Sequence, residues 1–145
     1  MSVVSEIMTR GAVTVRQESK PTALDVAQVM AKSRTGSVII TAEGKPAGII
    51  TERDLLKKVS AKDRKPGEIP ASQIMSSPVI AVKAYDSVDT AASVMAKNRI
   101  KRLAVVEDDG SLAGVISATD IAKKLARILA DDYNRYGSLK AVLDL

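Results

Sequence analysis

Two hydroxyl–aspartate pairs are the side chains of this sequence whose types and spacing could do chemistry. They end two similar segments, Gly48-Ile-Ile-Thr-Glu-Arg-Asp54 and Gly114-Val-Ile-Ser-Ala-Thr-Asp120. Each pair could imitate half of an acid–base site. Each is also typical of a helix start, because the hydroxyl accepts hydrogen bonds from free backbone N–H groups and negative charge is favoured in the first helical turn. The pairs therefore predict two strand-to-helix junctions, with a chemical role as an open second function.

The residue inventory argues against catalysis. The chain has no Cys and no His, which removes thiolate and imidazole metal ligands and the usual general base. Without a carboxylate dyad or a phosphate-binding P-loop, no reaction can be assembled around the pairs. Glu52 beside Asp54 suggests Mg²⁺, but neighbouring side chains on a helix diverge. We therefore expect a protein that is not an enzyme, holds no metal or cofactor of its own, and meets Mg²⁺ only when a nucleotide brings it.

The composition indicates a compact protein with an aliphatic core. Of its 145 residues, 46% are hydrophobic, yet it has three Tyr, no Phe and no Trp, which disfavours a stacking platform for single-stranded nucleic acid. The net charge of +5 and basic clusters such as 62–65 and 123–127 keep nucleic-acid binding open as an alternative. No signal peptide and no membrane-spanning run are visible, so we expect a cytoplasmic protein without a membrane partner.

The two junction segments belong to a longer internal repeat. Ser5-Glu-Ile-Met8 returns as Ser72-Gln-Ile-Met75, and Val29-Met-Ala-Lys32 returns unchanged as Val94-Met-Ala-Lys97. Agreement in order, spacing and residue type excludes chance. We divide the chain into a first repeat with the start of a linker at 1–63, a polar linker at 64–71, a second repeat at 72–127 and a helical tail at 128–145.

Each repeat is predicted to contain a helical turn, a strand, a long helix, a β-hairpin and a closing helix, in that order. The first long helix should start near Pro21-Thr22, because proline is tolerated at a helix start and apolar residues follow at helical spacing. Hairpins are expected at 37–41 with 46–50 and at 102–106 with 112–116. Their runs are β-branched and nearly continuous, so both faces of each sheet should be covered, with helices on one side. The fold class is therefore α/β (α+β).

The closing helix of the second repeat should extend into the tail, to about residue 135, before Gly137 breaks it. Leu125, Ile128 and Leu129 give it an apolar stripe, and 139–145 is a short apolar segment. Packing on its own domain and contact with another subunit are equally open for this tail.

The order of elements, the Gly-x-x-[Thr/Ser]-x-x-Asp ending and the tandem arrangement resemble a pair of CBS domains, the Bateman module. The resemblance covers nearly the whole chain apart from the linker and the tail. It implies two repeats related by pseudo-twofold symmetry, with two related sites in the cleft between them. The implied ligands are AMP first, then ADP or ATP, with S-adenosylmethionine as a further option. It also implies a homodimer that signals to an unknown effector protein.

Carried over residue by residue, the resemblance implies one binding site at each junction. In the family, the motif aspartate binds the ribose hydroxyls and the motif hydroxyl contacts ribose or phosphate. The other repeat supplies backbone to the base and the start of its second strand to the phosphate. The first site would comprise Thr51, Arg53, Asp54, Val79, Ile80, Lys101 and Arg102. The second would comprise Ala12, Val13, Thr14, Gly36, Ser37, Ser117 and Asp120.

The two implied sites are expected to differ in charge. Lys101-Arg102 stands where the first repeat has Gly36-Ser37, and Arg53 stands where the second has Thr119. Because Arg matches phosphate bidentately and Lys adds a point charge, the Asp54 site is predicted to be anion-selective and the Asp120 site weaker or suited to a less charged ligand. Besides nucleic-acid binding, the alternative is a structural or interaction module in which the aspartates are caps only, the charges are solvated and the clefts are vestigial.

Overall fold

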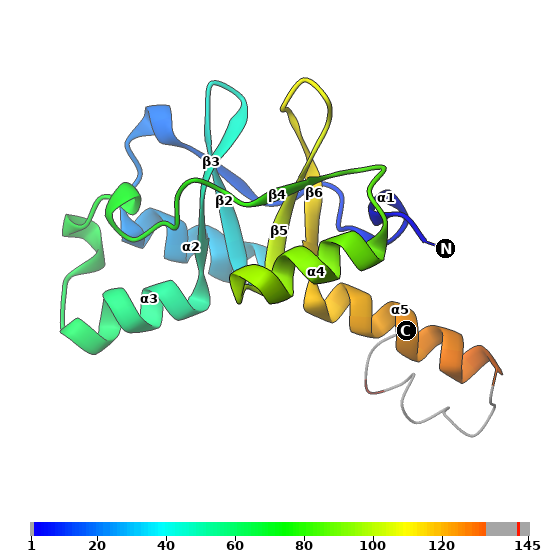
Figure 1. The fold of residues 1–145 in the computed structure, drawn as a ribbon. Coiled ribbons are helices and arrows are strands. Elements are labelled where there is room, and N and C mark those ends of the chain that lie inside the picture. Colours follow the sequence, from blue (N-terminus) through cyan, green and yellow to red (C-terminus); the bar gives the residue numbers. More distant parts are fainter. Residues whose placement is uncertain (1, 133–141, 143–145) are drawn as a thin grey trace.

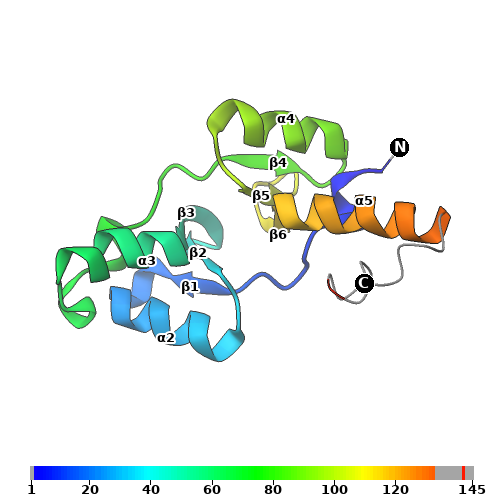
Figure 2. The same cartoon turned by 90° about the horizontal axis from the view of Figure 1, so that it is seen from below.

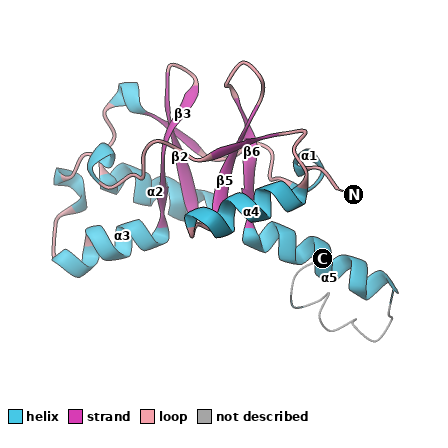
Figure 3. Ribbon diagram, viewed as in Figure 1, coloured by secondary structure: helices cyan, strands magenta, loops and turns pink. Residues whose placement is uncertain are grey.

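The computed structural model describes residues 2–132 and residue 142, which form two similar α/β units side by side (Figures 1 and 3). The first six elements are α1 (Val4–Ile7), β1 (Thr14–Arg16), α2 (Ala23–Ser33), β2 (Ser37–Ala42), β3 (Lys45–Thr51) and α3 (Glu52–Lys58). They are followed by β4 (Ala81–Lys83), α4 (Val88–Asn98), β5 (Arg102–Val106), β6 (Leu112–Ser117) and α5 (Ala118–Asp132). Short 3₁₀ turns lie at 17–19, 60–62, 66–68 and 71–73. The predicted order of strands and helices is confirmed in both repeats.

Each repeat contains a three-stranded sheet whose strand order follows the chain. β1 runs parallel to β2, which pairs with β3 as an antiparallel hairpin, and β4, β5 and β6 repeat this arrangement. The register places Ser37 opposite Thr51 and Arg102 opposite Ser117. The two hairpins lie beside each other with their turns at the same end of the molecule (Figure 1). The predicted α/β class, with one small sheet per repeat, is confirmed.

The hairpin strands are buried on both faces, as their continuous apolar runs predict. In β2, Val38 and Ile40 join the core formed with α2, while Ile39 between them is 1% exposed although it points to the opposite face. Ala104 of β5 is likewise buried away from the core of its own repeat. Ile39 and Ala104 each line a hollow shared with the other repeat, so the inner faces of the two sheets lie toward each other.

Side-chain caps set where the long helices start. The Thr22 hydroxyl accepts a hydrogen bond from the Asp25 N–H at 3.2 Å, and the Asp25 carboxylate accepts one from the Thr22 N–H at 2.8 Å. This reciprocal pair satisfies two backbone donors and begins α2 at the predicted place. Ser87 caps α4 by accepting from the Thr90 N–H at 3.0 Å.

The segment that opens each sequence repeat packs on the opposite repeat. Val4 and Met8 lie in the core of the second repeat, and Ile74, together with Ala71 just before the second repeat, lies in the core of the first. The Val4 N–H donates to the Asp86 carbonyl at 2.8 Å. The Ala71 N–H donates in the same way to the Pro21 carbonyl at 2.9 Å. Figure 2 shows the N-terminal segment beside α4 and α5, although β1 lies with α2.

α5 runs through Asp132, which confirms the expected continuation into the tail up to that residue. The expected break at Gly137 and the apolar segment 139–145 lie outside the described residues, apart from Val142, whose side chain is exposed. Among the described residues, no helix combines the length and the apolar character needed to cross a bilayer.

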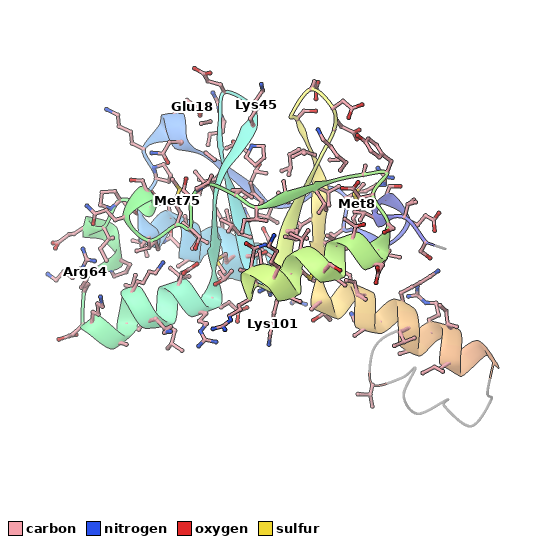
Figure 4. The ribbon with its side chains drawn as sticks, in the orientation of Figure 1. Met8, Glu18, Lys45, Arg64, Met75 and Lys101 are labelled. Atoms are coloured by element: carbon pink, nitrogen blue, oxygen red, sulfur yellow. The ribbon has the colours of Figure 1, made fainter. Side chains whose placement is uncertain are left out.

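Residues 3–9 and 71–76, which pack on the opposite repeat, are called the crossing segments below. The glycines of the two junction motifs lie where these segments pass over β6 and β3. A Cβ at Gly114 would lie 2.5 Å from the backbone oxygen of Thr9, with Met8 also in contact. A Cβ at Gly48 would overlap the side chain of Met75, which lies beside β3 in Figure 4. Close approach of a crossing segment, rather than a turn, therefore requires glycine at both positions.

Gly114→Ala is expected to lower the free energy of unfolding by about 1–3 kcal/mol, because the backbone of Thr9 can yield only if the crossing segment shifts. Gly48→Ala is expected to cost less, since the flexible thioether of Met75 can adopt another rotamer. Gly67→Ala is the matched control, because its Cβ would make an ordinary 3.6 Å contact with Leu24. Denaturant unfolding followed by circular dichroism measures all three, and equal costs at positions 114 and 67 would contradict this account.

Candidate functional site

β3 runs directly into α3, and the junction between them is a reciprocal helix cap. The Thr51 hydroxyl accepts from the Asp54 N–H at 3.3 Å, and the Asp54 carboxylate accepts from the Thr51 N–H at 2.9 Å and from its hydroxyl at 3.2 Å. β6 and α5 meet similarly. The Asp120 carboxylate accepts from the Ser117 N–H at 2.9 Å, and the Ser117 hydroxyl accepts from the Asp120 N–H at 3.0 Å. The predicted capping role of both pairs is confirmed.

Asp54 is more heavily committed within the protein than Asp120. Its second oxygen forms an ion pair with Lys58 Nζ at 3.0 Å, and the same Nζ donates to the Ile74 carbonyl at 2.9 Å. An ionised carboxylate offers about four lone-pair positions. The cap and Lys58 together use three of these at Asp54, whereas among the described residues the cap is the one donor to Asp120.

The wall facing each junction comes from the opposite repeat. The segment before β4 docks on β5, where the Ala104 N–H donates to the Ile80 carbonyl at 3.2 Å. The segment before β1 docks on β2 in the same way, with the Ile39 N–H donating to the Val13 carbonyl at 3.0 Å. These hydrogen bonds extend the parallel pairing of β4 with β5 and of β1 with β2 by one residue, and both segments line the clefts between the two repeats.

A cleft of about 460 Å³ lies between the Asp54 junction and the second repeat. Asp54 is the acidic side chain of its lining, and Arg99 adds a cationic side chain to those expected there. Lys101 lies between the two repeats (Figure 4). The lining contains every residue predicted for the first site, namely Thr51, Arg53, Asp54, Val79, Ile80, Lys101 and Arg102. This cleft therefore combines one carboxylate, several cations and an apolar wall.

A related cleft of about 360 Å³ lies at the Asp120 junction. Its cationic side chains are Arg34 and Arg102. Of the predicted second site, it contains Ala12, Val13, Gly36, Ser37, Ser117 and Asp120. Thr14 does not join this cleft. It lies two residues beyond Ala12, about 7 Å farther along the strand, and borders a separate hollow near the hairpin turns.

Sequence reasoning missed Arg34 and Arg99 and placed Arg102 at one cleft only. Arg34 follows α2 and Arg99 follows α4, and they line the second and the first cleft. Both have left-handed backbone, with φ of 53° and 55°, where glycine is the usual residue at a helix end. An arginine at the same place in both repeats was the available signal. Arg102 lines both clefts because it lies opposite Ser117 in the hairpin.

The cationic side chains of the two clefts have no acidic partner within the described part of the chain. Ion pairs there use Arg16, Lys58 and Lys83 as cations. The cleft cations that form none are Arg34, Arg53, Arg99, Lys101 and Arg102. Positive charge without a partner, gathered in a concave site, raises the local concentration of anions and so favours an anionic ligand.

The repeats match a known family of domains. The sequence profile described as CBS domain matches residues 4–61 and again residues 71–127. An uncharacterised protein of Methanopyrus kandleri is 40% identical over 119 residues, which cover 81% of this chain. The same match spans 60% of the length of that relative.

Two solved structures share the architecture. A CBS domain protein of Pyrobaculum aerophilum complexed with AMP aligns with a TM-score of 0.75 and 33% identity, covering 82% of this chain and 89% of that one. A CBS domain pair complexed with 5′-methylthioadenosine and S-adenosyl-L-methionine aligns with a TM-score of 0.76 and 26% identity, covering 86% and 99%. The two matched repeats, folded and paired as described above, show that this chain belongs to the CBS domain family and carries a tandem CBS pair.

Proposed function

We propose that this CBS pair is a non-catalytic regulatory module that binds an adenine nucleotide, AMP first, in the cleft at the Asp54 junction. One observation carries the proposal: a carboxylate from the first repeat lies opposite cations and an apolar segment from the second, around a single cleft. A ribose diol, a phosphate and a flat base need these three surroundings. The volume of about 460 Å³ lies within the usual range for small-molecule sites.

Each part of the nucleotide has a matching group in this cleft. The ribose hydroxyls donate to Asp54, which gains a second free lone pair when the Thr51 hydroxyl turns from the carboxylate to the ligand. Lys101 and Arg102 face the phosphate, and charge-assisted hydrogen bonds of this kind are about twice as strong as neutral ones. The base packs on the apolar segment before β4. ADP and ATP place further charge on the same cationic side, with Arg53 and Arg99 in reach of it.

The Asp120 cleft is proposed to favour a less charged adenosine ligand. It is lined by two cationic side chains instead of four, and its carboxylate is the less committed of the two. At this cleft, contacts with the ribose therefore contribute a larger share of the binding free energy, and contacts with the phosphate a smaller share. Ligands of this class, 5′-methylthioadenosine and S-adenosylmethionine, occupy one of the solved CBS pairs.

Ligand binding would signal by changing the arrangement of the two repeats. Each cleft has one wall from each repeat, so a ligand that contacts both walls favours the conformations in which they lie closer. An effector protein that binds one arrangement better than the other would read this change, since coupling between two ligands requires such a difference in affinity.

We also propose that the module is a homodimer that associates through its closing helices. Leu56 on α3 and Leu125 on α5 are 63% and 59% exposed, and Ile128 and Leu129 continue the stripe on α5. An apolar stripe on α5, together with the exposed leucine on α3, is the kind of surface that a second copy covers.

AMP is expected to raise the melting temperature of the wild-type protein, because a ligand that binds the native state stabilises it. Asp54→Asn should weaken AMP binding by about 10- to 100-fold, since the amide loses charge-assisted hydrogen bonds while keeping an oxygen for the cap. Asp25→Asn in the equivalent cap of α2, outside both clefts, is the matched control. Isothermal titration calorimetry measures the three affinities. No thermal shift across a panel of adenosine ligands would instead favour a structural module.

Arg99→Gly is expected to move stability and binding in opposite directions. Glycine accommodates the left-handed conformation, so the free energy of unfolding should rise by about 0.5–1 kcal/mol. AMP binding should weaken by about 5- to 10-fold, because one of the four cationic side chains that line the cleft and attract the anion is lost. Lys20→Gly, at another left-handed residue outside both clefts, should gain stability without changing AMP affinity. An arginine with a purely structural role would leave AMP affinity unchanged, as measured by calorimetry beside denaturant unfolding.

Leu125→Gln is expected to convert the dimer into a monomer, because it removes apolar surface from α5 while keeping good helix propensity. Size-exclusion chromatography with light scattering gives the mass of each species. Leu24→Gln, at a partly exposed leucine on α2, is the control and should leave the mass unchanged. A monomeric wild-type protein, or a variant that stays dimeric, would refute the proposed interface.

A further inference from the structure

Arg102 lies between the two clefts and lines both of them. Its backbone opens β5 in the second repeat. Its Nη2 atom lies 3.0 Å from the point that a Cβ on Gly36 would occupy, so the guanidinium reaches across to the first repeat. Gly36 is itself part of the Asp120 cleft. One half-buried guanidinium is therefore within reach of both clefts.

This guanidinium has no equivalent and no acidic partner. Ser37 occupies the matching position of the first repeat, so pseudo-symmetry supplies no second arginine. The Glu52 carboxylate lies 3.1 Å from the same point over Gly36. Even so, Arg102 forms no ion pair with any residue in the described part of the chain. The two clefts thus share one cationic side chain, Arg102, that forms no ion pair within the described residues.

We propose that the two clefts share Arg102, so that phosphate-bearing ligands bound in them antagonise each other; this rests on the proposed adenosine-ligand function. A guanidinium offers a planar fork that matches one phosphate bidentately. When a phosphate in the Asp54 cleft holds Arg102, the Asp120 cleft keeps Arg34 as its remaining cation. A second phosphate then binds with less compensating charge and in the field of the first.

The same geometry makes the antagonism specific to charge. A ligand with the same base and ribose but no phosphate, such as 5′-methylthioadenosine, has no group that competes for the guanidinium. Two such ligands therefore do not antagonise each other through Arg102. Antagonism that came from the base and ribose bridging the two walls would instead affect charged and uncharged ligands alike, because both ligands carry these groups.

A thermodynamic cycle with AMP measures this coupling. Asp120→Asn reports the association constant of the Asp54 cleft alone, and Asp54→Asn reports that of the Asp120 cleft alone. The coupling factor is a ratio of two products. Its numerator is the product of the two stepwise association constants of the wild-type protein, and its denominator is the product of the two single-cleft association constants. We expect a factor of about 0.2 or less for AMP, a reduction of at least about 5-fold, which is typical of coupled sites. We expect a factor within about twofold of one for 5′-methylthioadenosine.

Arg102→Gln in the same three backgrounds should return the AMP factor to about one, and Arg102→Lys, which keeps the charge but not the fork, should give an intermediate value. An AMP factor of one in the wild-type protein overturns the proposal, as does equal coupling for both ligands. The wild-type comparison of the two ligands stands even where an Arg102 variant fails to fold. Absence of binding at either cleft contradicts the proposed function itself, whereas binding without coupling contradicts the sharing of Arg102 alone.

Discussion

The arrangement of this protein depends on the close passage of each crossing segment over a glycine of the opposite repeat. Because Gly48 has no side chain, the side chain of Met75 can pack directly on β3. Because Gly114 has none, the backbone of Thr9 can pack directly on β6. The same crossings carry Val4 into the second core. Each core is thus completed by residues that the sequence assigns to the other repeat. The two halves are therefore interdependent. The crossing segments fix the relative positions of the walls of the clefts between them.

The strand-to-helix junctions then decide where a carboxylate can face a ligand. Because Thr51 ends β3 and also caps α3, no loop separates strand from helix, and Asp54 lies at the edge of the inner sheet face. Its carboxylate satisfies the helix start and lines the cleft at once. Lys58 distinguishes this junction from its counterpart by tying Asp54 to the carbonyl of Ile74, in the segment that crosses between repeats. The ammonium group of Lys58 therefore connects Asp54, which lines the cleft, to that segment.

Local patterns in the sequence predicted local structure well. The caps at Thr51 and Ser117, the start of α2 and both hairpins follow from hydrogen-bonding side chains and from apolar periodicity, which act within a few residues. The residues assigned to the first site came from the resemblance to CBS pairs, and the structure brings them together around one cleft.

Features that depend on distant packing were not predictable in the same way. Each crossing segment packs against residues that are far from it in the sequence. In addition, Ile69 is a core residue within the mostly polar run 60–71, so its burial does not show in the sequence pattern. Thr14 lies too far along β1 to line the second cleft, and the sequence motif does not show where along the strand the cleft ends. The motif also does not show that the long side chain of Arg102 reaches both clefts. Arg34 and Arg99 occupy a backbone conformation that sequence alone would assign to glycine.

The charges around the first cleft suggest why an anion should matter for the arrangement of the repeats as well as for occupancy. Arg53 belongs to the first repeat, whereas Arg99, Lys101 and Arg102 belong to the second. Arg53, Arg99 and Lys101 are exposed and Arg102 is half-buried, so solvent screens the repulsion between them. Asp54 on the same wall as Arg53 attracts the cations of the opposite wall, so attraction and repulsion offset each other between the two walls. In the proposed complex, a phosphate attracts the cations of both walls. The energy that binds the anion would then act on the relative position of the repeats, which the crossing segments link to both cores.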